Sequence, residues 1–132
     1  MSQERAADLN FLQTLYRYLL DEYNRLNLLK TDLERTIETL KALNKAQEEE
    51  VGPLIIPVSS FLSLLVDGVK AKETLVLMGG NIYAKMGPEE ALKQAQERLE
   101  EVNKGLQEVG MNLTKVQLEI ENLQRGTSRR AR

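Results

Sequence analysis

The side chains that most often carry out chemistry in proteins are scarce in this chain. Its 132 residues include no His and no Cys, which removes the commonest general base and the most nucleophilic side chain. Gly79-Gly80 lacks the spaced Lys-Ser/Thr of a phosphate-binding loop. The many Asp and Glu residues lie in segments that favour solvated helix faces, so nothing places two carboxylates in a dry cleft. We therefore predict that the protein is not an enzyme and holds no metal or cofactor.

Composition indicates long helices with a narrow apolar seam. Charged residues make up 29% of the chain and aromatic residues only 5%, which does not favour a thick globular core. The net charge of −2 creates no field that would draw the chain to nucleic acid or to an anionic membrane. No signal peptide is evident, and no apolar run approaches the ~18 residues of a membrane span. We expect a soluble, cytoplasmic protein with no membrane or nucleic-acid partner.

The first helix is expected over residues 3–51. Apolar side chains recur in it at alternating steps of three and four residues, which is the repeat of a coiled coil. No Gly or Pro interrupts this segment, and Gly52-Pro53 should end it. Lys30 and Asn44 are polar seam positions that can fix the register. The seam consists of Leu9, Leu12, Tyr16, Leu19, Tyr23, Leu26, Lys30, Leu33, Ile37, Leu40 and Asn44.

A second helix with the same repeat is expected over residues 88–124. Pro88 suits a first helical position, and Glu89 and Glu90 complement the positive end of the helix. Gly105 and Gly110 are expected off the seam, as a weak point of the helix. Residues 125–132 are basic, and we expect a disordered tail. The second seam consists of Leu92, Ala95, Leu99, Val102, Leu106, Val109, Leu113, Val116, Ile120 and Leu123.

Residues 53–86 are rich in β-forming side chains and should link the helices. Turn signals at Ser59-Ser60 and Gly79-Gly80 predict two β-hairpins, over residues 54–66 and 73–86. A single hairpin turning at Asp67-Gly68 is the alternative. Pro57 suggests a strand edge or a strand end.

The two seams can bury each other if the linker turns the chain back. We prefer this antiparallel, intramolecular pairing to a parallel homodimer because the local effective concentration is far higher. The hairpins then carry more apolar surface than a solvated loop tolerates, and isolated hairpins are marginal in water. We therefore expect their strands to pair with other subunits. The predicted assembly residues are Ile55, Ile56, Phe61, Leu62, Leu64, Leu65, Leu75, Val76, Leu77 and Ile82.

This helix–β–helix plan resembles the prefoldin alpha subunit over nearly the whole chain. The most specific stretches are Leu54-Ile55-Ile56-Pro57-Val58, Phe61-Leu62, Leu64-Leu65-Val66-Asp67 and the run from Leu75 to Lys85 that leads to Glu89-Glu90-Ala91. They are similar to the family's "VP" strand, its "FL" strand ending in valine–aspartate, its glycine-closed strand and its "YxVE" strand. The chain departs from that pattern with Ile-Pro for Val-Pro, with Ala84-Lys85 for Val-Glu and with a shortened turn at Ser59-Ser60.

The resemblance implies one prefoldin-like domain over residues 1–132 and a mainly α fold with a small β portion. It implies a hexamer of two alpha-type and four beta-type subunits, whose hairpins build a central β-barrel that carries six coiled coils. Such assemblies are ATP-independent holdases that grip unfolded proteins at the coiled-coil tips and pass them to a group II chaperonin. The two-hairpin linker fits the alpha type, because the beta type has a single hairpin.

Unfolded clients would need apolar side chains that the seams do not use. Phe11, Leu15 and Tyr18 share one face of the first helix, and Met111 and Leu118 lie seven residues apart on the second. Scattered exposed apolar residues are also normal on protein surfaces. The alternatives are therefore a structural coiled-coil adaptor without holdase activity, and nucleic-acid binding through the basic tail. The predicted client-binding residues are Phe11, Leu12, Leu15, Tyr18, Met111 and Leu118.

Overall fold

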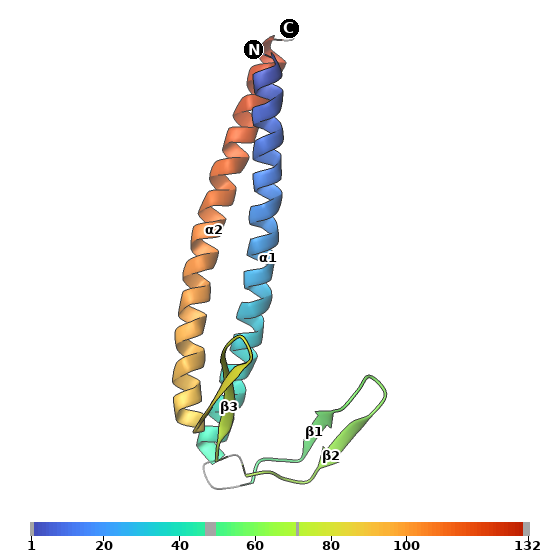
Figure 1. Cartoon of the computed structure of the whole chain (residues 1–132), viewed down its shortest axis with the longest axis vertical. Coiled ribbons are helices and arrows are strands. Elements are labelled where there is room, and N and C mark those ends of the chain that lie inside the picture. The colour runs from blue at the N-terminus through green and yellow to red at the C-terminus, as the bar shows by residue number, and fades with distance from the viewer. Residues whose placement is uncertain (1, 47–49, 71, 131–132) are drawn as a thin grey trace. The chain divides into compact units, whose positions relative to one another are not determined.

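The computed structural model describes residues 2–46, 50–70 and 72–130. The chain forms α1 (Ser2–Ala46), β1 (Leu54–Pro57), β2 (Ser63–Val66), β3 (Thr74–Gly79), β4 (Ile82–Met86) and α2 (Pro88–Arg130), shown in Figure 1. The chain divides into two compact units. The terminal unit contains residues 1–31 and 100–132, and the hairpin unit contains residues 32–99. Each unit therefore contains a stretch of both helices.

Helix α1 ends earlier than its sequence suggested. It spans Ser2–Ala46, whereas the absence of Gly and Pro predicted a helix to residue 51. The backbone of Val51 instead exchanges hydrogen bonds with Val69, at 2.8 Å and 3.0 Å. This bridge closes the base of the first hairpin. Val51 is therefore extended rather than helical, because its backbone hydrogen bonds go to Val69, which is distant in sequence. Residues 47–49 of the expected helix lie outside the described residues.

Helix α2 begins as predicted and continues further than predicted. Pro88 is its first residue, and the carbonyl oxygen of Gly87 accepts a 3.0 Å hydrogen bond from the amide of Ala91. The helix runs through Gly126 to Arg130. Residues 125–130 are thus helical rather than a disordered tail, because a single Gly costs a helix only ~1 kcal/mol. Residues 131–132 lie outside the described residues.

In the terminal unit the two helices pack antiparallel through their seams. Leu12, Leu26, Val102 and Val116 are buried there, and the other seam residues of this unit are half-buried. Gly105 and Gly110 face α1, which corrects the expectation that they lie off the contact. A Cβ on Gly105 would lie 3.4 Å from Leu26, and one on Gly110 would lie 3.8 Å from Tyr23. Both distances are ordinary van der Waals contacts, so α1 leaves room for a methyl group at either glycine.

The linker forms two separate antiparallel hairpins, and the alternative of a single hairpin is wrong. Strand β1 pairs with β2, with Ile55 opposite Leu65 and Ile56 opposite Leu64. Pro57 is the last residue of β1, as expected. Strand β3 pairs with β4 with a register shift between Leu77 and Gly79. The turn that joins β3 to β4 contains Gly80 at a positive φ of 55°, a conformation that favours glycine.

The second hairpin packs against the helices of its own unit. Ile37, Leu40, Ala91 and Ala95 form a buried cluster, and Val76 of β3 and Met86 of β4 pack on it. The paired helices therefore leave a face for this hairpin, because Ala91 and Ala95 are small and make room for its side chains.

Candidate functional site

The first hairpin exposes apolar side chains on both of its faces. Because side chains alternate along a strand, Ile55 and Leu65 share one face, while Ile56 and Leu64 share the other. All four are exposed, with Ile55 at 72% and Leu65 at 74%. The structure provides no cover for either face of this hairpin within the described residues. Both faces therefore need covering by another molecule.

The loop of the first hairpin presents the most exposed apolar side chain. Phe61 is 96% exposed. The hydroxyl oxygen of Ser59 accepts hydrogen bonds from the amides of Phe61 and Leu62, both at 3.2 Å, and the amide of Val58 donates to the carbonyl oxygen of Leu62. The loop is thus ordered by local hydrogen bonds while its aromatic side chain projects outward.

The second hairpin has one covered and one open face. Thr74, Val76, Ala84 and Met86 are half-buried toward the helices. On the opposite face, Leu75, Leu77 and Tyr83 are exposed. This hairpin therefore offers one apolar face for assembly, whereas the first hairpin offers two.

Nine of the ten predicted assembly residues are exposed in the single chain. Val76 differs, because it packs on the core cluster of its own chain, and we exclude it from the open surface. Four other exposed apolar residues in or beside the hairpins were not among the predicted assembly residues. They are Val58, Val69, Met78 and Tyr83. A signal existed for Val58, Met78 and Tyr83, which lie within the predicted hairpins, whereas Val69 lies between the two hairpins.

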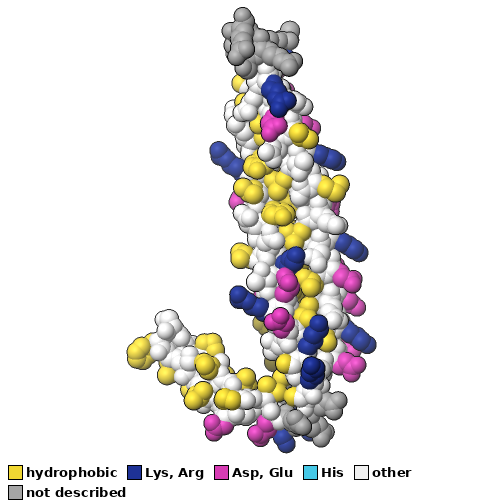
Figure 2. Space-filling view, turned by 180° about the vertical axis from the view of Figure 1, so that it is seen from behind, with side chains coloured by type: hydrophobic (Ala, Val, Ile, Leu, Met, Phe, Trp, Pro, Cys, Tyr) yellow, Lys and Arg dark blue, Asp and Glu magenta, His cyan; other side chains and the backbone are white. Residues whose placement is uncertain are grey.

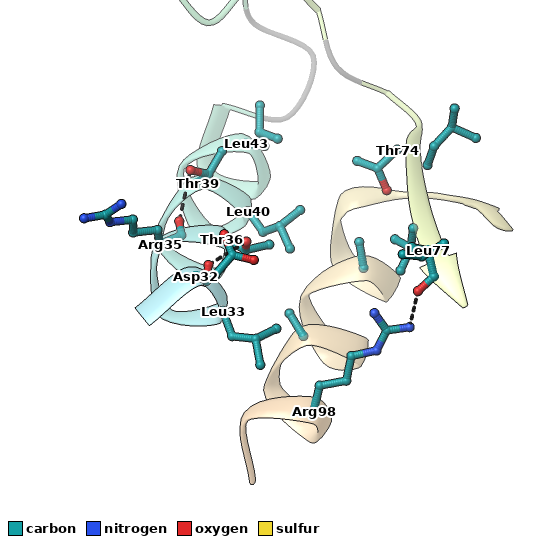
Figure 3. Close-up of a pocket in the computed structure, with 14 residues that line it drawn as sticks. Asp32, Leu33, Arg35, Thr36, Thr39, Leu40, Leu43, Thr74, Leu77 and Arg98 are labelled. Carbon is teal, nitrogen blue, oxygen red and sulfur yellow. Dashed lines mark hydrogen bonds between the residues drawn. The ribbon is translucent and has the colours of Figure 1, made fainter. Parts of the chain in front are cut away.

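An apolar groove lies beside β3, as Figure 3 shows. Its volume is about 510 Å³, and Leu33, Leu40 and Leu43 of α1 line it together with β3 and α2. Arg98 of α2 donates a hydrogen bond of 2.5 Å to the carbonyl oxygen of Leu77, which ties β3 to the helix. The hydroxyl of Thr36 donates to the helix backbone at 2.8 Å. The groove thus adds to the apolar surface beside the open face of the second hairpin.

The predicted client-binding residues divide into exposed and buried ones. Phe11, Tyr18, Met111 and Leu118 are exposed, with Phe11 at 67%. Leu15 is half-buried. Leu12 is only 9% exposed, because it is a seam residue, so it offers little surface while the helices stay paired. Figure 2 shows apolar side chains between charged ones along the helices.

A second groove, in the terminal unit, joins some of these residues. This tip groove has a volume of about 500 Å³ and is formed by both helices. It contains Phe11 and Leu12, whereas Leu15, Tyr18, Met111 and Leu118 are not among its lining residues. Its other lining residues were not predicted as client-binding residues, although the three residues from each helix follow the i, i+3, i+4 spacing of one helix face. The tip groove is lined by Asp8, Phe11, Leu12, Glu119, Asn122 and Leu123.

The described residues form neither a metal site nor a membrane-spanning helix. Within residues 2–46, 50–70 and 72–130, no group of three or more Asp, Glu or His side chains is arranged to hold a metal ion. Across the same ranges, neither helix contains a stretch apolar enough to cross a membrane. The apolar hairpin faces and the tip groove are therefore the surfaces that need a functional explanation.

Comparison with known protein families explains this arrangement of helices and hairpins. The family model described as Prefoldin subunit matches residues 12–132. The chain belongs to the prefoldin family. This assignment confirms the resemblance to the prefoldin family, whose members are non-enzymatic chaperones. The expected fold is also confirmed, with two long helices joined by two small antiparallel hairpins.

The prefoldin fold is also found in a solved structure. The chain is similar to filamentous PFD from Methanocaldococcus jannaschii, with a TM-score of 0.69 and 23% sequence identity. The similarity covers 89% of this chain and 96% of that one. No curated protein matches the chain. Prefoldin membership supports a co-chaperone role and oligomeric prefoldin partners.

Proposed function

We propose that this prefoldin subunit is a holdase co-chaperone of the alpha type. It captures unfolded polypeptides at the tip of its coiled coil, without ATP, and delivers them to a group II chaperonin in the cytoplasm. The observation that carries the proposal is the set of exposed apolar side chains on otherwise charged helices, namely Phe11, Tyr18, Met111 and Leu118. Exposed apolar groups of this kind suit contacts with unfolded chains, and Met adapts to varied partners.

The hairpins support assembly with beta-type subunits. Two hairpins per chain fit the alpha type, and the three open apolar faces described above favour strand-to-strand and face-to-face contacts between subunits. We propose that the whole chain acts as one prefoldin-like domain. Its hairpins complete a β-barrel in a hexamer of two alpha-type and four beta-type subunits, and its helices project from that barrel.

Aggregation assays on the assembled complex test the holdase proposal. The complex should suppress aggregation of a chemically denatured model protein when no ATP is present. Deletion of residues 1–18 together with 111–132 should abolish this suppression while the complex keeps its subunit number in native mass spectrometry. Suppression that survives the deletion would show that clients bind elsewhere.

Delivery to the chaperonin needs a separate measurement. Adding a group II chaperonin and ATP should release the held model protein and restore its native activity. Release without any chaperonin would contradict the delivery step.

A structural scaffold is the second candidate. The similar protein from Methanocaldococcus jannaschii is described as filamentous, which favours a role in which paired helices hold partners at a fixed spacing. A scaffold would bind one folded protein selectively and would not suppress aggregation. Electron microscopy of the purified chain distinguishes an open filament from a closed complex.

A further inference from the structure

The tip groove combines an apolar floor with acidic walls. Phe11, Leu12 and Leu123 supply the apolar surface, and Asp8 and Glu119 supply two carboxylates. Among the residues that the structure describes, none that lines the groove is Lys or Arg. The groove therefore differs from a simple apolar patch, because its charge has one sign.

The two carboxylates are available to a ligand. Among the side chains that the structure describes, the ion pairs join Arg25 to Glu22 and Lys85 to Glu73. Neither pair includes Asp8 or Glu119, so no described basic side chain neutralises the groove from within the chain. A cation that entered the groove would meet these two charges without displacing any of the described basic side chains.

The placement of the carboxylates follows from the antiparallel helices. Each helix contributes an acid at position i and a Leu at position i+4, namely Asp8 with Leu12 and Glu119 with Leu123. Because the helices run in opposite directions, one carboxylate lies toward each end of the groove.

We propose that the tip groove selects unfolded segments in which an apolar side chain is flanked on both sides by Lys or Arg. The apolar side chain packs on Phe11 and the Leu floor, and the two flanking cations lie near Asp8 and Glu119. This inference rests on the proposed holdase function and specifies which client sequences it takes. An acidic segment of equal hydrophobicity meets like charge at both ends and binds more weakly.

Three fluorescent peptides of equal length test this preference on the assembled full-length protein. In the first, Leu is flanked by two Lys; in the second, Leu is flanked by two Glu; in the third, the two Lys are moved to the peptide ends. Dissociation constants come from fluorescence anisotropy at low and at high salt. We expect the first peptide to bind about fivefold more tightly than either other peptide at low salt, and the difference to shrink at high salt.

Substitutions in the groove assign the preference to these carboxylates. Asp8→Asn with Glu119→Gln should bring the three dissociation constants to within about twofold of one another. Asp21→Asn with Glu108→Gln removes the same number of charges from exposed positions that do not line the groove. This control should leave the preference unchanged.

The outcomes separate the two proposals. Equal binding of the three peptides by a complex that still suppresses aggregation overturns the charge selection and leaves the holdase function standing. An equal loss of preference in the control variant also overturns it, because the effect would then be one of net charge. A complex that binds no peptide and suppresses no aggregation contradicts the holdase function itself.

Discussion

Glycines inside α2 show how single positions set the stability of the paired helices. Gly110 faces Tyr23 of α1, and an added Cβ would lie 3.8 Å from that ring, an ordinary contact distance. Gly110→Ala should therefore raise the free energy of unfolding by about 1 kcal/mol, because Ala favours the helix over Gly. Urea unfolding followed by circular dichroism measures the change. A lower unfolding midpoint would mean that α1 cannot accommodate the methyl group.

Gly52 should respond in the opposite way. A Cβ at this position would overlap the backbone carbonyl oxygen of Asp67 and lie 2.8 Å from Gly68 Cα. Backbone atoms at the base of the first hairpin cannot move aside cheaply, so Gly52→Ala should destabilise the fold by about 2 kcal/mol. Gly87→Ala is the matched control, because no atom lies within 4 Å of its added Cβ. The same urea measurement should show a loss for the first variant and a far smaller change for the second.

The ion pair between Glu22 and Arg25 predicts a contribution to stability that depends on pH. Arg25 lowers the pKa of Glu22, mainly by a side-chain hydrogen bond, with a nitrogen–oxygen distance of 2.6 Å. A lowered carboxyl pKa stabilises the folded state above the unfolded pKa of 4.5, and this stabilisation is lost as the pH falls through the folded pKa. Glu22→Gln should lower the urea midpoint slightly near neutral pH and leave it unchanged in strong acid. A difference that persisted in acid would point to a cause other than charge.

Among the secondary-structure elements, the second hairpin has two faces with different roles. One face packs on the helices of its own chain, and we propose that the other contacts other subunits. Val76 packs on the helix cluster of its own chain, so Val76→Asp should destabilise the fold by about 3 kcal/mol. Its neighbour Leu75 is exposed on the opposite face. Leu75→Asp should leave the helical content and its thermal unfolding unchanged while it lowers the assembled fraction in native mass spectrometry. Equal effects of the two substitutions on unfolding would contradict the one-sided packing.

The elements themselves could be predicted from the sequence because their signals are local. Steps of three and four residues from Leu9 to Asn44 identified α1, and turn residues identified both hairpins. The end of α1 could not be predicted, because the backbone of Val51 forms hydrogen bonds with Val69, a residue distant in sequence. The docking of Val76 on Ala91 and Ala95 likewise depends on which face of the hairpin meets the helices.

The candidate sites could be predicted only in part, because some of their residues carry a local signal and others come together only in the folded chain. Exposed apolar residues such as Phe11 and Phe61 stand out from the seam pattern. The acidic walls of the tip groove, Asp8 and Glu119, come together only when the two helices pair in a definite register. Solvated carboxylates are common on helices, so neither residue could be distinguished in the sequence.

At the scale of the whole molecule, the first hairpin predicts that both of its faces contribute to assembly. Ile55 and Leu65 lie on one face, and Ile56 and Leu64 on the other. Changing either pair to Ser should shift the complex toward free subunits at a given concentration, because each face loses buried apolar area. Sedimentation velocity of the reconstituted complex measures the shift. If only one pair matters, the other face is exposed in the assembly.

A control for this experiment changes residues of the same linker that are already polar. Lys70→Ser with Lys72→Ser alters exposed side chains next to the hairpins and should leave the sedimentation profile unchanged. Dissociation in this variant would indicate that charge in the linker, rather than apolar area, holds the subunits together.

The two open faces of the first hairpin also bear on how the protein is made. In a newly synthesised chain that has not assembled with other subunits, Ile55, Phe61 and Leu65 are exposed to solvent. Such exposed apolar surface promotes aggregation and proteolysis. We therefore expect its steady-state abundance to follow that of its partners. Overproducing it alone should give inclusion bodies or rapid turnover, whereas balanced synthesis with the matching subunit should rescue the yield.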